Sequence, residues 1–373
     1  MYNLIISKNL EEYNWNDELK KNQCSNFFQT KEYLESQSNS NEKFPIFIMV
    51  KNETGKILGQ LGVIVKKSPT VYSSKILKNI SKIFSVLGNR ISWVGGPIIH
   101  SEQKSEREEI LEIIIQGLEQ VSRTNDVFMI DGYTNPLDKT IDNNYKNKFL
   151  ENGFSKINFL TYVLDLTKTD EVIWNGLNKS ARRDVQKAEK KEIIVKEFEE
   201  NDLEEFFKLS KIWGKTKGIE KSENSLNMKM YWEYYKKGTE KIFLAYENNE
   251  LISSHRIGIF NKIAYSHSLI SSYKKSGSIG GPYLTWYAMR WAKENGMKVY
   301  DFSGGEAPQK EEFDLKYEKQ WGSLLAYKKK WGGEEIPYYH FVKIQKKNAQ
   351  KIMRILLKFD LLIKNYNRKQ FQG

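Results

Sequence analysis

The stretch Trp291-Ala-Lys-Glu-Asn-Gly-Met-Lys-Val-Tyr-Asp-Phe-Ser-Gly-Gly305 predicts the end of a helix, a sharp stop and a short buried strand. Leu284 and Ala288 lie with Trp291 on one helical face, so this helix is expected to pack against a sheet. Gly296 suits the end of the helix, and residues 299–302 form the apolar strand. A packed helix followed by such a strand is typical of an α/β fold.

The same order of elements is predicted in both halves of the chain. Each half has a hairpin of strands, a Gly-Gly-Pro tripeptide, an amphipathic helix and a buried strand. In the first half they cover residues 45–65, 95–97, 106–121 and 127–131. In the second half they cover residues 241–260, 280–282, the helix that Pro282 opens, and 299–302. We therefore expect two copies of one α/β unit, each with a mixed central sheet flanked by helices.

The first copy is expected to close near Ser155, which gives domains at residues 1–155 and 156–340. The last segment, residues 341–373, is basic and carries Ile344, Ile352 and Ile355 at helical spacing. It is predicted to be an amphipathic C-terminal helix. Docking on the domains is the favoured interpretation, and contact with a membrane surface is the alternative.

Charge and cysteine content restrict the partners. With 59 basic and 47 acidic residues, the chain has a formal net charge of +12, which favours anionic partners, although a general excess of lysine explains it too. Cys24 is the only cysteine, so no disulfide framework forms within the chain, and no metal site is predicted. The sequence shows neither a long apolar run nor a secretory signal, so we expect a cytoplasmic protein.

A helix with two different faces is predicted at residues 178–190. Its apolar face is formed by Leu177, Ala181, Val185 and Ala188. The opposite face carries a row of cations, Lys179, Arg183, Lys187 and Lys190, which Arg182 widens. Because guanidinium forks bind phosphates, this row suits a pyrophosphate or an RNA backbone. A solvated surface helix is the alternative.

Two other groups of residues are candidates for binding. Gly280 and Gly281 precede a predicted helix N-terminus, where exposed backbone N–H groups bind anions, although such loops are common. His255 and His267 lie in adjacent predicted strands. Without a carboxylate partner they do not make a metal site, so we expect packed or surface histidines.

Lys316 lies among apolar and aromatic residues, just past the strand that ends in Asp301. An ammonium held in such surroundings can stabilise a developing oxyanion. A surface lysine on an amphipathic turn is the alternative. Asp301 is the nearest candidate for a general base, but a carboxylate at a strand end also often caps the following turn.

The ordered set of motifs resembles the FemAB/FemX aminoacyltransferases and their GNAT-like relatives over roughly residues 25–340. The motifs are Trp-x-Gly-Gly-Pro, the Lys-x-x-Arg-Arg-x-x-x-Lys-Ala helix, the stretch at 291–305 and Lys-x-x-x-x-Trp-Gly. The resemblance implies tandem GNAT-like domains and transfer of an amino acid from aminoacyl-tRNA to an amine of a peptidoglycan precursor, with neither metal nor CoA. It also implies that Lys316 stabilises the negative charge of the reaction.

The expected function is therefore acyl transfer onto an amine of a phosphate-bearing cell-envelope precursor, with aminoacyl-tRNA as donor. The protein is expected to be a monomer in the cytoplasm, with peripheral contact at the inner face of the membrane as an option. The first alternative is a CoA-dependent N-acyltransferase acting on a sugar or small amine. The second is a non-catalytic polyanion-binding protein with the same fold.

Overall fold

The computed structural model describes residues 1–38, 43–67, 88–217, 225–272, 277–307 and 324–346. These residues form two compact units. The first unit holds Met1–Ile157 and, from Tyr339, the end of the described chain. The second holds Asn158–Thr216 and the later described residues up to Tyr338. Each unit combines one mixed sheet with helices, which confirms the predicted α/β class.

The sheet of the first unit has the strand order β1-β2-β3-β4-β6-β14. Its strands are β1 (Asn3–Ser7), β2 (Lys43–Lys51), β3 (Ile57–Lys67), β4 (Asn89–Val94), β6 (Val127–Tyr133) and β14 (Glu334–Ile344), with the short β5 (Ile98–Ile99) paired to β3. β4 and β6 run parallel, and the other neighbours run antiparallel. The paired hairpin strands β2 and β3 match the sequence prediction.

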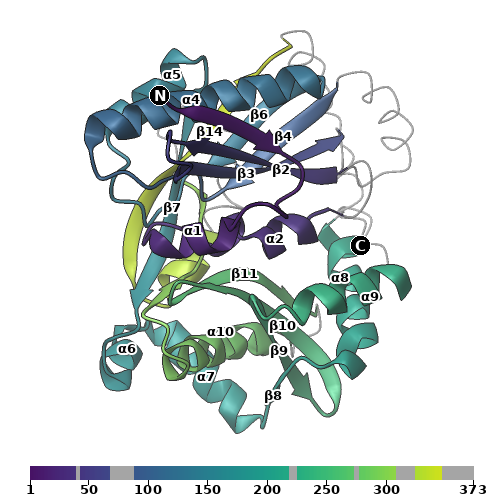
Figure 1. Cartoon of the computed structure of the whole chain (residues 1–373). Helices are drawn as coiled ribbons and strands as arrows, with labels where there is room; N and C mark the ends of the chain where they lie inside the picture. The colour runs from purple at the N-terminus through teal and green to yellow at the C-terminus, as the bar shows by residue number, and fades with distance from the viewer. Residues whose placement is uncertain (39–42, 68–87, 218–224, 273–276, 308–323, 347–373) are drawn as a thin grey trace. The chain divides into compact units, whose positions relative to one another are not determined.

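Helices lie on both faces of this first sheet (Figure 1). They are α1 (Trp15–Lys21), η1 (Phe27–Gln29), α2 (Lys31–Ser36), α4 (Lys104–Thr124) and α5 (Asn143–Glu151). A Cβ on Gly59 of β3 would lie 2.5 Å from Ile110 of α4, whereas one on Gly62 would meet Leu34 of α2. Since residues three apart in a strand point to opposite faces, α4 and α2 cover opposite sides of β3.

The sheet of the second unit has the strand order β7-β12-β11-β10-β9-β8. Its strands are β7 (Ser155–Asp165), β8 (Ile194–Glu197), β9 (Glu240–Glu247), β10 (Glu250–Phe260), β11 (Ile263–Ser271) and β12 (Val299–Asp301), with β13 (Gly305–Glu306) paired to β7. β11 and β12 run parallel, and the other neighbours run antiparallel. The hairpin between β9 and β10 turns at Asn248 and Asn249, both with positive φ, as asparagine tolerates.

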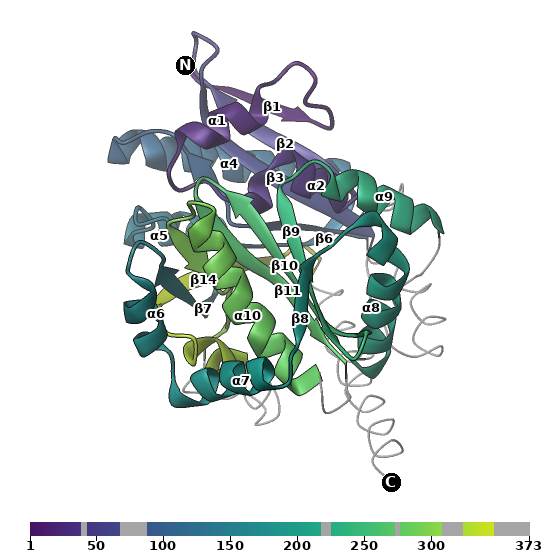
Figure 2. The same ribbon diagram turned by 90° about the horizontal axis from the view of Figure 1, so that it is seen from below.

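Helices cover both faces of the second sheet, and the longest of them lies along one face (Figure 2). They are α6 (Asp170–Gly176), α7 (Lys179–Lys190), η3 (Glu200–Asp202), α8 (Leu203–Lys217), α9 (Ser225–Tyr235) and α10 (Gly277–Glu294), with a further helical segment at 324–329. α10 packs on β9, β10 and β11 and against α7. On its predicted apolar face, Leu284 and Ala288 are buried and Trp291 is partly buried against the core.

The two units repeat one order of elements. β1, β2, β3, β4, α4 and β6 in the first unit correspond to β8, β9, β10, β11, α10 and β12 in the second. The final strand of each sheet, however, comes from beyond its own half of the repeat. β7, which follows the first repeat, completes the second sheet, and β14, which follows the second repeat, completes the first. The units have therefore exchanged their closing strands.

The prediction of a terminal helix over residues 341–373 was wrong at its start. Residues up to Ile344 belong to β14, and Phe341 is buried with its ring stacked on Phe149, the centroids 4.2 Å apart. Residues 347–373 lie outside the described residues. Both expected domain boundaries, after residues 155 and 340, fall inside the strands β7 and β14, where the chain passes between units.

Candidate active site in the second unit

The parallel strands β11 and β12 part soon after they begin. Their ladder pairs Ile263 with Val299 and ends where Tyr265 faces Asp301. Beyond it, the N–H of Phe302 bonds to the carbonyl of Tyr162 on β7, 3.0 Å away, which continues the β12–β7 ladder, while the link to β11 is the side chain of Ser303, whose Oγ donates to the Ser266 carbonyl at 2.6 Å. Ser266 is the first residue of β11 past this ladder.

A buried histidine contacts Ser266 at this point. The Nε2 of His255, on β10, lies 3.0 Å from Ser266 Oγ, and its Nδ1 lies 3.3 Å from the carbonyl oxygen of Leu284. A carbonyl oxygen only accepts, so Nδ1 carries the hydrogen and Nε2 accepts the hydroxyl hydrogen of Ser266. Burial lowers the pKa of His255 to about 4, which keeps the ring neutral at pH 7.

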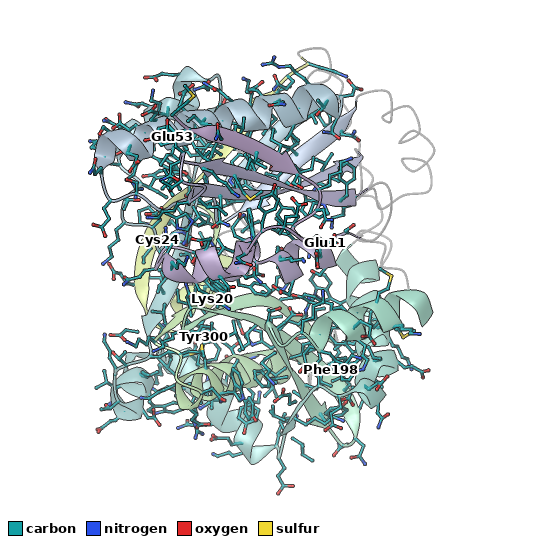
Figure 3. The ribbon with its side chains drawn as sticks, viewed as in Figure 1. Glu11, Lys20, Cys24, Glu53, Phe198 and Tyr300 are labelled. Atoms are coloured by element: carbon teal, nitrogen blue, oxygen red, sulfur yellow. The ribbon has the colours of Figure 1, made fainter. Side chains whose placement is uncertain are left out.

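Tyr300 completes this cluster from β12, and Figure 3 labels it among the side chains of the second unit. Its hydroxyl lies 3.4 Å from His255 Nε2, and its side chain is fully buried. Burial raises the pKa of Tyr300, so the hydroxyl stays protonated. The cluster thus presents one half-buried hydroxyl, Ser266, backed by a neutral imidazole.

Asp301 holds the turn at which the strands part. Its Oδ1 accepts hydrogen bonds from Thr161 Oγ1 at 2.6 Å and from the Ser303 backbone N–H at 2.8 Å. Burial raises the pKa of Asp301, against the opposing effect of these bonds. The structure places Asp301 as a buried turn cap, and its action as a general base stays a prediction.

A lysine that the sequence did not single out supports the same turn. Lys328 Nζ donates to the carbonyls of Ser303 and Gly304 at 2.6 and 2.9 Å. Burial lowers the pKa of Lys328 to about 8, and the carboxylate of Asp301 opposes that shift. The run Lys328-Lys-Lys330 gives no sign of which lysine faces inward, so only the fold identifies Lys328.

Helix α7 has the two faces predicted for it. Ala181, Val185 and Ala188 are buried, and the cations Lys179, Arg183, Lys187 and Lys190 are exposed. Arg182 does not widen this row, which corrects the prediction. Its Nη1 donates to the carbonyls of Trp174, Asn175 and Leu177, the last at 2.6 Å, and so caps the end of α6.

The prediction that Pro282 opens a helix was wrong, because α10 begins at Gly277 and contains Pro282. Gly280 and Gly281 are therefore buried helical residues instead of a loop before the helix. A Cβ on Gly280 would lie 2.9 Å from Ile252 Cδ1 and 3.0 Å from Ser253 Cβ, so the glycine lets α10 approach β10 closely. Residues 273–276, just before the helix, lie outside the described residues.

Lys316 and its aromatic neighbours also lie outside the described residues, so its role rests on the sequence.

Within the described ranges, no group of three or more histidine, cysteine or acidic side chains is arranged to hold a metal ion. Burial raises the pKa of the half-buried Cys24 thiol to about 11. Of the helices in the described chain, none combines the length and apolar character needed to cross a bilayer.

Two sheets, each crossed by a helix that joins its parallel strands, define a tandem GNAT fold. The structure of FemX has this fold, with a TM-score of 0.67 and 14% identity over 94% of this chain and 99% of that chain. A tandem GNAT protein from the clavulanic acid biosynthesis pathway gives a TM-score of 0.54 and 8% identity, with 92% and 98% covered. The predicted FemX-type tandem fold is thereby confirmed.

A third similar structure is the C-terminal domain of a putative lysylphosphatidylglycerol synthetase from Agrobacterium fabrum. Its TM-score is 0.50 and its identity 11%, over 90% of this chain and 94% of that chain. No family model matches the sequence, and no curated protein matches it. At these identities the likeness establishes the fold.

Proposed function

We propose that this protein is an acyltransferase that moves an aminoacyl group from aminoacyl-tRNA onto an amine of a phosphate-bearing cell-envelope precursor. The observation that carries the proposal is the tandem GNAT fold, with Ser266 and His255 placed where β11 and β12 part. The names of the similar structures, FemX and lysylphosphatidylglycerol synthetase among them, support this chemistry.

In the proposed reaction, the amine nitrogen attacks the ester carbonyl carbon of the aminoacyl-tRNA. A C–N bond forms, and the carbonyl oxygen becomes an oxyanion, which Lys316 stabilises. The C–O bond to the ribose then breaks, the nitrogen loses one proton, and a ribose hydroxyl is regenerated. The products are an amide and free tRNA, and no redox step is involved.

Ser266 is suited to orient the attacking amine. Because its O–H points at His255 Nε2, its remaining lone pair is available to accept an N–H from the amine. The amine nitrogen gains positive charge during the attack, so this hydrogen bond strengthens toward the transition state. His255 then acts as a positioning residue that holds the hydroxyl in the required orientation.

Replacing Ser266 by alanine is expected to lower kcat/KM for the amine about tenfold, the effect of one hydrogen bond of about 1.4 kcal/mol. The donor KM should stay unchanged. Steady-state kinetics with each substrate varied in turn measures both. Ser268→Ala, two residues along the same strand, is the matched control, and an equal loss in both variants would remove Ser266 from the site.

The cation row of α7 is proposed to bind substrate phosphates. Arg183→Ala/Lys187→Ala should weaken tRNA binding and reduce the slope of log affinity against log salt by roughly 2, about one for each phosphate that a removed side chain neutralises. Fluorescence titrations of tRNA binding at about 50 to 200 mM salt measure this slope. Lys208→Ala/Lys229→Ala, which removes two exposed cations from α8 and α9, should leave the slope unchanged. Equal slopes in all three proteins would show that the cations of α7 do not bind the phosphates of tRNA.

The donor decides between the proposal and its CoA-dependent alternative. Purified protein is incubated with an amine-bearing envelope precursor and either labelled aminoacyl-tRNA or labelled acyl-CoA, and the amide product is identified by mass spectrometry. Amide formed from aminoacyl-tRNA alone supports the proposal. Amide formed from acyl-CoA alone would replace it with the alternative, and binding of tRNA without turnover would favour a non-catalytic role.

A further inference from the structure

Three cations lie side by side on the first sheet, on the face that carries α2. Lys43 of β2 stands directly opposite Lys66 of β3, and Lys66 stands directly opposite Arg90 of β4. Lys66 is four residues from Gly62 along β3, so both point to the same face of the sheet, where Gly62 faces Leu34 of α2. Directly opposed residues of antiparallel strands have Cβ atoms roughly 5 Å apart, and like charges there destabilise the sheet.

Among the residues that the structure describes, Asp131 is the carboxylate that faces this row, and it is already engaged. Asp131 of β6 accepts from Arg90 Nε at Oδ1 and from Arg90 Nη2 at Oδ2, the latter at 2.6 Å. His340 Nε2, on β14, contacts the same Oδ2 at 3.1 Å. Lys43 Nζ donates to the neutral amide of Gln37 at 3.2 Å. In the part of the chain that the structure describes, Lys66 forms neither an ion pair nor a side-chain hydrogen bond.

Electrostatics agrees with this geometry. Burial lowers the pKa of Lys66 to about 8, and the charges of Arg90 and Lys43 push it in the same direction. Burial also lowers the pKa of Lys43. Within the described ranges, three partly buried cations thus share the carboxylate of Asp131, an arrangement that costs folding free energy unless an anion is bound.

We propose that Lys43, Lys66 and Arg90 form a binding site for a phosphate group on the first unit. Two ammonium groups and the remaining Nη1 of Arg90 offer donors from three adjacent strands. A phosphate has about two negative charges and three free oxygens to receive them, whereas a carboxylate has one charge and two oxygens. This site involves none of the residues assigned above to acyl transfer or to the α7 row, and it does not depend on the proposed function.

The test is calorimetric titration of the full-length protein with inorganic phosphate at pH 7 and constant ionic strength. Wild type should bind one equivalent saturably. Lys66→Gln should weaken binding about tenfold or more, since one charge-assisted hydrogen bond is removed, and Lys43→Gln/Lys66→Gln should abolish it. The matched control, Lys51→Gln/Lys56→Gln, removes the same charge at the other end of the β2–β3 hairpin and should bind as wild type does.

Thermal unfolding separates a binding site from a structural role. In phosphate-free buffer Lys66→Gln should unfold at the same temperature as wild type or higher, because a like-charge contact is removed. Phosphate should raise the unfolding temperature of wild type more than that of Lys66→Gln, and should not raise that of Lys43→Gln/Lys66→Gln. A parallel titration with uridine diphosphate distinguishes the ligand source. Binding of uridine diphosphate that is tighter than that of phosphate and is abolished in Lys43→Gln/Lys66→Gln indicates a phosphate on a larger molecule, and equal binding indicates free phosphate. Equal phosphate affinity in wild type and both glutamine variants of the site would overturn the proposal.

Discussion

Replacing Lys316 by alanine is expected to lower kcat by a factor on the order of 10²–10³ and to leave substrate binding almost unchanged. The amine attack creates a tetrahedral species with a negative oxygen. Lys316 is close in sequence to Phe313, Tyr317 and Trp321, and we expect such aromatic neighbours to shield an ammonium from water and so to strengthen its attraction to that oxygen. Because the attraction grows as charge develops, it acts on turnover. Single-turnover kinetics with saturating donor measures the effect directly.

Two further variants show whether the charge is needed at this position. Lys316→Arg should recover part of the activity, because a planar fork does not replace a compact ammonium. Lys319→Ala removes a neighbouring lysine and should retain near-wild-type kcat. If Lys319→Ala loses turnover while Lys316→Ala retains it, the role inferred from the family resemblance belongs to a different lysine.

The second large effect is on stability, where Glu240→Ala is expected to lower the free energy of unfolding by about 3–5 kcal/mol. Glu240 is 1% exposed and accepts from Arg256 Nε and Nη2, both at 3.0 Å, and from His267 Nδ1 at 2.9 Å. Its removal leaves the mostly buried Arg256 guanidinium without its counterion. Urea unfolding followed by circular dichroism measures the loss. Glu294→Ala, which breaks an exposed pair with Arg290, should cost less than about 1 kcal/mol.

The lowered pKa of Glu240 predicts how the free energy of unfolding depends on pH. Burial raises the pKa of Glu240, but Arg256 and His267 outweigh burial and bring the pKa to about 2. A folded-state pKa below the unfolded value, about 4.3, means that the stabilisation is complete above that value and is lost as pH falls toward 2. Glu240→Gln should flatten the stability curve over this interval. Parallel curves for wild type and the variant between pH 4.5 and 2 would contradict the assignment.

Local sequence patterns predicted most elements because they depend on neighbours within a few residues. The hairpin β9–β10 and the helix α4 follow from alternation and from a 3.6-residue period. β14 escaped prediction because Phe341 and Ile344 fit helical spacing as well as a strand, and its partner β6 is some 200 residues away in sequence. The start of α10 was misplaced because a proline usually marks the first turn.

The candidate site was predicted less well than the fold, because its contacts cross between strands. His267 was expected to have no carboxylate partner, yet it bonds to Glu240 at the start of a strand two positions away in the sheet. His255 was expected to be either packed or at the surface; it is packed, and its contact with Ser266 depends on strand register. Arg182 and Arg183 are adjacent in sequence, and only the fold shows that one caps a helix while the other is exposed.

The exchange of closing strands also determines the order in which the chain can finish folding as it is synthesised. When the second repeat leaves the ribosome, its closing strand β7 has already been made. The first repeat must wait for β14, and at 5–20 residues per second that delay is roughly 10–40 s. During this time the apolar edge of β6 has no neighbour on one side, a condition that favours aggregation. Translation speed and chaperone binding should therefore affect the yield of this protein through the first unit more than through the second.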